Sequence, residues 1–541
     1  MKGGHAEEGT RLASIANETP GRQGRESGRP PVEGGGVAAR VKEAPGGLFK
    51  QALDISEAVN DAVAVRRLDQ FLVQQDSVAA LRIWCGIPSP RRLVFSKEEL
   101  LNRLSSDIAD LDALLNEQLN AILHHPRFQR LEASWRGLRY LYDQCRGAEG
   151  VKLRVLNLSW KELAGDLQRA IEFDQSKFFN KIYNEEFGSP GGEPFGVILG
   201  DYEIRLRSSA EHPVNDLDVL ESLSHVSAAA FVPMIMGAHP AFFGLDSFAQ
   251  LGTPLNLPRT FQQTEYLKWR SFRDSEDARF LGLVLPRVLM RLPYEDLGGR
   301  SDAFRFVEEV SGPDSSRYLW GTAVYAFGSV LSRAFSQSGW PANIQGVERG
   351  VETGGLVTGL PLHGFNTDLV GVANKYSTDV LITDTQEKEL GELGFIPLCY
   401  CKDTRWCAFY GSASIQKPKV YDEVAATVNA RLSAMLQYMF CVSRFAHYLK
   451  IIGRDRVGSF ATAQQCETYL QRWLLNYTID ADDATLDTKA RAPLREGKVE
   501  VREKPGKPGS FNCVMHLRPH FQLDQVVTSI KLVTEITPGA G

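Results

Sequence analysis

Long apolar runs and dense basic patches are both absent from this sequence. The most apolar stretch, residues 228–238 (AAAFVPMIMGA), is too short to cross a bilayer and contains Pro233. No apolar segment follows the charged amino terminus, so a signal peptide is not predicted. The formal net charge is −5, and no block of Lys and Arg is interleaved with aromatic residues to bind nucleic acid. We therefore expect a cytoplasmic protein with no direct membrane insertion and no nucleic-acid partner.

Cysteine is scarce, with eight in 541 residues. Without a secretion signal, free and mostly buried thiols are the expectation. Three of them cluster at Cys399, Cys401 and Cys407, but the spacings C-x-C and C-x5-C fit no standard zinc or redox motif. His516 and His520 are four residues apart, yet an intervening proline and an extended pattern prevent them from sharing a helix face. We expect no metal site and no cofactor.

Motifs of common enzyme classes are missing as well. The sequence contains no GxxxxGK[ST], no G-x-S-x-G and no HExxH. Residues 187–200 (FGSPGGEPFGVILG) are rich in glycine, but these glycines precede a predicted strand, whereas a nucleotide loop follows one. Residues 346–359 lack the GxGxxG spacing. Both stretches favour turns, and no catalytic residue is assigned from a motif.

What remains has the composition of a globular protein, with 43% hydrophobic and 23% charged residues. Residues 1–46 hold ten glycines, four prolines and no aromatic residue, so we predict a disordered tail. Residues 47–98 are interpreted as a linker that includes a possible donated strand. Two further domains are predicted over residues 99–375 and 376–541.

The hydrophobic pattern predicts an α/β (α+β) fold with mixed sheets covered by helices. Ser96–Glu99 and Ser159–Glu162 are capping boxes that begin helices. An apolar stripe from Leu100 to Ile122 follows the first box. Strands are predicted over residues 151–158, 195–200, 231–236, 380–383, 395–400, 406–410, 498–503, 513–518 and 523–536. Further helices are predicted over residues 216–230, 317–335, 422–452 and 461–477.

One charged cluster invites a catalytic interpretation. Residues 444–460 (RFAHYLKIIGRDRVGSF) contain Arg444, His447, Arg454, Asp455 and Arg456. An enzyme site around Arg444, His447 and Asp455 is one hypothesis. The other is a structural helix end, because Gly453 suits the position after a helix ending near Ile452 and cations favour the negative end of the helix dipole. The structural hypothesis uses every charge in the stretch, so we prefer it.

Several long stretches resemble the large contractile-sheath subunit of the bacterial type VI secretion system, the TssC/VipB family. They are HHPRFQRLEASWRGLRYL (residues 124–141), EFDQSKFFNKIYNEEFGSPGGEPFGVILGD (172–201), EYLKWRSFRDSEDARFLGLVLPRVLMRLPY (265–294), EKELGELGFIP (387–397) and PHFQLDQVVTSIKLV (519–533). The charged stretch above matches too. The resemblance covers about residues 98–541.

The resemblance implies a mechanical protein and not an enzyme. Such a subunit pairs with a small sheath subunit of the TssB/VipA type and stacks with copies of itself in a six-start helix around an inner tube of the Hcp type. Contraction would drive tube and spike into a target cell. A baseplate would anchor the sheath to the envelope complex, and an AAA+ ATPase of the ClpV type would dismantle it, mainly through the small subunit.

Two surfaces are expected to serve this assembly. The last extended segment is interpreted as a strand that pairs with a neighbouring subunit, although an ordinary edge strand within its own domain is the alternative. Its candidate residues are Leu523, Val526, Val527, Ile530, Leu532 and Val533. The resemblance also implies a helix that faces the tube, for which we choose residues 461–477, with Glu467 and Arg472 as polar contacts. A plain surface helix is the alternative there.

Overall fold

The computed structural model describes residues 69–84, 96–189, 191–296, 298, 304–310, 315–347, 351–364, 375–401, 404–455, 462–481, 485–504, 511–520 and 530–536. The chain divides into two compact units, Met1–Ser106 and Asp107–Gly541, and helix α4 (Lys97–Leu123) contains the division. In the first unit, α3 (Ser77–Trp84) is described, and the rings of Phe71 and Trp84 lie 5.3 Å apart. The predicted tail at residues 1–46 and most of the linker at 47–98 lie outside the described residues.

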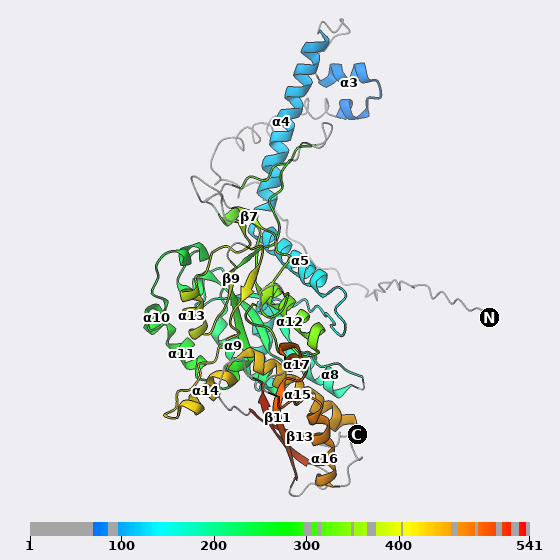
Figure 1. Ribbon diagram of the computed structural model, residues 1–541. Coiled ribbons are helices and arrows are strands. Elements are labelled where there is room, and N and C mark those ends of the chain that lie inside the picture. Colours follow the sequence, from blue (N-terminus) through cyan, green and yellow to red (C-terminus); the bar gives the residue numbers. More distant parts are fainter. Residues whose placement is uncertain are drawn as a thin grey trace, which may run out of the picture. The chain divides into compact units, whose positions relative to one another are not determined.

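A six-stranded mixed sheet forms the centre of the second unit (Figure 1). Its order is β1 (Ile198–Ile204), β2 (Met234–Ala238), β3 (Leu281–Leu285), β9 (Ile396–Tyr400), β10 (Cys407–Phe409) and β6 (Leu356–Val357). The first four strands run parallel, and β9, β10 and β6 pair antiparallel. Every residue of β2 and β3 is buried, as expected for central strands with helices on both faces.

Alternate residues of each central strand enter different cores. Met234 and Met236 of β2 pack with α6 (Trp160–Arg169), α9 (Asp216–Ala230) and α11 (Leu267–Arg273), whereas Ile235 packs with α12 (Val324–Ser338) and α5 (Pro126–Cys145). This period of two is the geometry of a strand with both faces covered. The sheet is therefore a rigid support for the helices that surround it.

A third core lies in the carboxyl-terminal part of the chain, coloured orange to red in Figure 1. There α15 (Leu436–Asp455) and α16 (Ala463–Leu475) pack with a three-stranded antiparallel sheet of β11 (Leu494–Glu503), β12 (Phe511–Pro519) and β13 (Ile530–Ile536). Alternate residues of β12 are buried, which matches one covered face. Trp340, just after α12, stacks on Phe445 of α15, with the ring centroids 4.5 Å apart. This contact connects the third core to α12, which packs on the six-stranded sheet.

Shorter elements complete the described chain. They are α7 (Lys177–Phe179), α8 (Glu185–Gly188), α10 (Leu257–Thr260), α13 (Asp384–Glu392), α14 (Val424–Ser433), α17 (Leu486–Arg491), β4 (Val288–Leu289) with β5 (Trp320–Gly321), and β7 (His363–Gly364) with β8 (Lys375–Tyr376). No helix in the described ranges is long and apolar enough to cross a membrane.

Three predicted elements are wrong, and a fourth is wrong at its start, since the helix predicted over 317–335 begins only at Val324, after strand β5. Residues 151–158 form no strand, and Val155 leaves 72% of its surface exposed, so the alternating pattern has no ladder partner in the described chain. Residues 380–383 lead into the capping box of α13 instead of forming a strand. The helix predicted over 422–452 is two helices, because Met435 bridges to Ala413 and the Ser414 hydroxyl donates to the Ala434 carbonyl at 2.5 Å.

Candidate assembly surfaces

The charged cluster on α15 is engaged in packing. His447 is only 7% exposed, and its Nε2 donates to the carbonyl oxygen of Ala230 at 3.2 Å. Burial lowers the pKa of His447 to about 4, so the ring is neutral and held against Phe187, 5.5 Å away. A buried, neutral histidine bonded to a carbonyl has no access to a substrate proton.

The other members of the cluster do not converge on this histidine. Arg444 donates to the Tyr448 hydroxyl at 2.6 Å and lies 4.4 Å from the Phe335 ring. Arg454 donates to Asp455 at 3.0 Å and to the Ser189 carbonyl at 3.2 Å. Arg456 lies outside the described residues. The helix also continues past Gly453 to Asp455, so the predicted end near Ile452 is wrong by three residues.

Lys450 makes a contact that the sequence did not reveal. Its ammonium lies 3.0 Å from the Tyr183 hydroxyl, and the rings of Tyr183, Phe231 and Phe187 surround it at 4.6, 4.8 and 5.3 Å. Tyr183 sits on a short π-helix, Asn180–Asn184. Since the partners are separated by more than 200 positions in the sequence, no local pattern could have paired them. These contacts of Lys450 attach α15 to the segments that contain Tyr183, Phe187 and Phe231.

The clustered cysteines are the other candidate reactive residues, and they are buried or in contact with neighbouring side chains. Burial raises the pKa values of the Cys399 and Cys407 thiols to about 12, so both stay protonated in their adjoining strands. Cys401 is half-buried, with its Sγ 3.6 Å from the Tyr410 hydroxyl. Within the described ranges, no three His, Cys, Asp or Glu side chains gather to hold a metal ion.

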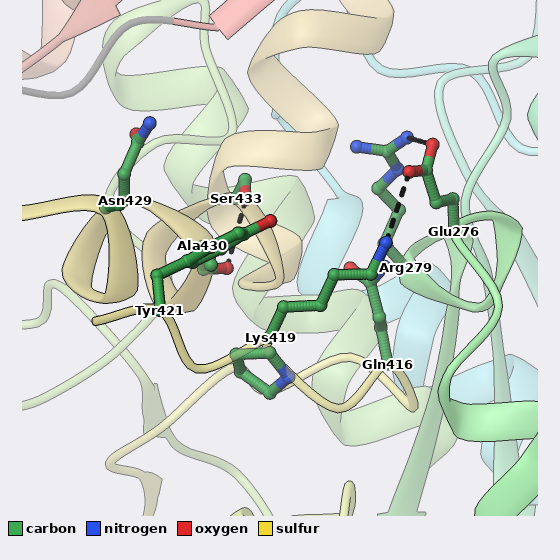
Figure 2. A pocket seen from close by; sticks show the side chains of 10 residues that line it. Glu276, Arg279, Gln416, Lys419, Tyr421, Asn429, Ala430 and Ser433 are labelled. Atoms are coloured by element: carbon green, nitrogen blue, oxygen red, sulfur yellow. Dashed lines mark hydrogen bonds and ion pairs between the residues drawn. The ribbon is translucent and has the colours of Figure 1, made fainter. Parts of the chain in front are cut away.

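Figure 2 shows a shallow polar pocket of about 240 Å³, lined by α14, by the chain between β10 and α14, and by the short 3-10 helix Asp277–Phe280 with the residue before it. Glu276 is one of its lining residues, and its carboxylate lies 3.6 Å from Arg279 and 3.7 Å from Lys419. Its lining residues are Glu276, Arg279, Gln416, Pro418, Lys419, Tyr421, Ala426, Asn429, Ala430 and Ser433. The lining contains one carboxylate and no His or Cys, so it offers neither an acid–base pair nor a nucleophile with its base.

The two edge strands of the carboxyl-terminal sheet, β11 and β13, differ in how their outer backbone groups are bonded. On β11, the N–H groups of Val499 and Val501 donate to Gln471 and Glu467 of α16, at 2.8 and 2.9 Å. Gln471 also donates to the Gly497 carbonyl at 2.8 Å. These side chains occupy backbone groups that an added strand would need. The outer edge of β11 is therefore closed by its own chain.

The opposite edge of the same sheet is β13. It pairs antiparallel with β12 from Ile530 opposite Leu517 to Ile536 opposite Phe511, and it is last in the strand order. Ile530, Leu532 and Val533 thus belong to a strand of the chain's own sheet, with no strand on its far side among the described ranges. Leu523, Val526 and Val527 lie outside those ranges.

The helix chosen as tube-facing is α16. Glu467 uses its carboxylate to cap β11, whereas Arg472 is exposed. One predicted polar contact is therefore already engaged within the chain, and the other is accessible.

Two consecutive helices leave apolar stripes in solvent. The stripe on α4, predicted from its spacing, consists in the second unit of Ile108, Leu111, Leu115, Leu119 and Ile122, and all five are exposed. On α5, Phe128, Leu131, Trp135 and Tyr142 repeat the pattern, with Trp135 66% exposed. Exposed apolar residues at such regular spacing indicate an interaction surface. Sequence periodicity found the first stripe but did not show that it stays uncovered.

Polar contacts hold the carboxyl-terminal half of α4 in place. The side-chain amide of Asn116 donates to the Arg305 carbonyl at 2.9 Å and accepts from the Val307 N–H at 3.0 Å. Asn120 repeats this with the Val307 carbonyl and the Glu309 N–H, at 3.2 and 2.8 Å. The extended segment 304–310 is thereby bonded along one face of the helix.

An ion network fixes the start of α5 to the same region. Arg291 donates to Glu132 at 2.8 Å and to Glu308 at 2.9 Å, and its guanidinium lies 4.4 Å from the Tyr294 ring. Arg136, one turn beyond Glu132, donates to the same carboxylate at 2.7 Å. Because Arg291 and Glu308 are buried, removal of either would leave the other charge uncompensated. Ion pairs and hydrogen bonds therefore attach both striped helices to residues 291–309.

Two family models match the chain. The first, described as EvpB/VC_A0108, tail sheath N-terminal domain, matches residues 105–416, and the second, EvpB/VC_A0108, tail sheath gpW/gp25-like domain, matches residues 425–536. A curated relative, the type VI secretion system sheath protein TssC1 of Pseudomonas aeruginosa, is 41% identical over 495 residues, which cover 90% of this chain and 94% of that protein. The two matched segments meet next to the pocket of Figure 2.

Proposed function

The chain belongs to the VipB family of tail sheath proteins, and from this premise we propose that it is the large structural subunit of a type VI secretion sheath. It pairs with a small sheath subunit and polymerises with copies of itself. The observation that carries the proposal is the family match across both halves of the chain. The buried, neutral state of His447 supports it, because the strongest catalytic candidate has a packing role.

The assembly surfaces support the same function. A subunit in a lattice needs exposed apolar area and an open backbone edge, both of which would be a liability in an isolated protein. The stripes of α4 and α5 supply the exposed apolar area. Within the described ranges, the far edge of β13 supplies the open backbone edge, while the edge of β11 is closed by α16.

The joint between subunits is proposed at the carboxyl terminus. Residues 523–536 carry it, with Leu523, Val526, Val527, Ile530, Leu532 and Val533 as the contributing positions. Strand addition there would use backbone hydrogen bonds for affinity and alternate side chains for register. The exposed face of α16 near Arg472 is the proposed contact with the inner tube.

The remaining partners follow from the proposed role. The sheath encloses an inner tube of the Hcp type in a six-start helix, rests on a baseplate at the cell envelope, and contracts to propel the tube. An AAA+ ATPase of the ClpV type recycles it, mainly through the small subunit. Assembly takes place in the bacterial cytoplasm.

Co-expression with a small sheath subunit tests this function. The full chain, tagged at its amino terminus, should retain the untagged small subunit through affinity purification. The pair should then sediment as polymer in an ultracentrifuge. Purification of the tagged chain without the small subunit, under conditions in which both are soluble, would overturn the proposal.

A further inference from the structure

Two departures from regular backbone geometry occur in the central unit, one at the end of α9 and one just before α8. Phe231 has a φ of 53° and a ψ of 40°, a left-handed conformation that helix caps normally reserve for glycine. Among the described residues, no other non-glycine residue has a positive φ. Asn180–Asn184 forms a π-helix, a rare conformation that often marks functional positions. Both conformations cost free energy, so other contacts must hold them.

The contact that the two segments share is with Lys450. The Phe231 ring lies 4.8 Å from the Lys450 ammonium, and Tyr183 of the π-helix approaches it with its ring at 4.6 Å and its hydroxyl at 3.0 Å. The Phe187 ring, at 5.3 Å, completes what we call the Lys450 cage. Glycine would adopt the conformation of Phe231 without strain, but it would supply no ring. Each irregular segment thus presents an aromatic ring to the same cation.

Lys450 belongs to a polar face in the second half of α15. His447, Lys450 and Arg454 are three and four residues apart, so they lie on one side of the helix. His447 bonds to the Ala230 carbonyl and Arg454 to the Ser189 carbonyl, both at 3.2 Å. All three contacts therefore fall in or near the two irregular segments. The apolar residues of the same half of α15 pack in the third core instead.

This polar face lies between the two segments that the family models match. Lys450 is in the matched segment 425–536, whereas the three rings of its cage are in the matched segment 105–416. Lys450 and Arg454 are only half-buried. Hydrogen bonds and cation–ring contacts at such positions contribute a small net free energy, because water competes for the same groups. These contacts can therefore open and close without unpacking the third core.

We propose that the Lys450 cage is a conformational latch between the two family domains. While the ammonium occupies the cage, Phe231 keeps its left-handed conformation and residues 180–184 keep the π-helix. When the ammonium leaves, both segments relax to regular geometry and the polar face of α15 separates from them. The latch belongs to a single chain, so it goes beyond the proposed function and operates whether or not the chain forms a sheath.

Hydrogen exchange followed by mass spectrometry tests the latch in the full chain. Lys450→Met keeps the length of the side chain and removes its charge. It should raise the exchange rates of residues 180–189 and 228–233 by roughly tenfold or more, because both segments lose the contact that holds them. Lys161→Met, at an exposed lysine on α6, is the matched control and should exchange as the wild type does. Unchanged exchange in Lys450→Met would overturn the proposal.

Two further variants distinguish a latch from a general loss of stability. Lys450→Arg keeps a cation and should retain slow exchange in both segments. Phe231→Leu combined with Lys450→Met should raise exchange of residues 180–189 no further than Lys450→Met alone, because Phe231 acts on the π-helix through Lys450. Additive effects in the double variant would overturn the proposal. A uniform rise over every peptide in Lys450→Met would overturn it as well, since it would show that the whole chain is destabilised.

Discussion

At the residue scale, the side chains that look most reactive in the sequence are those with packing contacts in the structure. His447 illustrates the reason. A helix places it where burial favours the neutral ring and a carbonyl accepts its N–H. Arg444 and Lys450 are surrounded by aromatic rings, which stabilise a cation while excluding water. Residue type alone cannot distinguish such a role from catalysis, because the deciding partners lie far away in the sequence.

The depressed pKa of His447 predicts a pH dependence of stability. The folded state binds its proton only near pH 4, whereas the unfolded chain binds it near the ordinary value of about 6.5. Protonation therefore favours unfolding, and stability is lost as the pH falls through this window. Chemical denaturation of the purified chain should show a loss of about 2 kcal/mol from this group between pH 7 and pH 5.

His447→Gln isolates this contribution, because an amide can still donate to the Ala230 carbonyl but does not titrate. The variant should lose less stability than the wild type on acidification. It should also pair with the small subunit as the wild type does. An identical pH dependence in both proteins would contradict the assignment.

At the element scale, local signals predicted local structure well. The capping boxes at Ser96 and Ser159 are present, with side chain and backbone bonded reciprocally. Positions of buried strands and amphipathic helices follow from hydrophobic periodicity, because burial selects the side chains. Residues 151–158 show the limit of this reasoning. Alternation of apolar and polar residues can indicate a strand. A strand also needs a second strand to pair with, and which strands pair depends on the topology of the whole sheet.

The closure of the β11 edge is a second element-scale feature with a measurable consequence. Glu467→Ala together with Gln471→Ala would free the N–H groups of Val499 and Val501. Lost hydrogen bonds of this kind cost about 1 kcal/mol each. The open edge should also promote association of the isolated chain, seen as increased light scattering. Gln464→Ala, an exposed position one turn before Glu467 on the same helix, is the control and should change neither quantity.

Deletion of residues 523–541 tests the terminal strand. It removes β13, leaves β12 as an unpaired edge, and should prevent polymer formation with the small subunit. Deletion of residues 537–541 alone keeps the strand and should leave assembly intact. Normal polymer from the longer deletion would show that the joint lies elsewhere.

At the scale of the whole molecule, family resemblance predicted what physical pattern alone could not. Composition and missing motifs removed several function classes but left both a sheath subunit and an unrecognised enzyme open. Long matching stretches decided the family, and the family models agree with that reading. Sequence periodicity found the α4 stripe, yet its exposure depends on Asn116, Asn120 and a segment almost two hundred residues away. Such long-range placement is settled only by the folded chain.

Negative-stain electron microscopy of the co-expressed chain and small sheath subunit tests the central claim most directly. If this chain works by assembling into a lattice, the purified pair should appear as hollow tubes with a cogwheel cross-section. Deletion of residues 523–541 should abolish them. A pair that remains a discrete heterodimer under every assembly condition would contradict the claim.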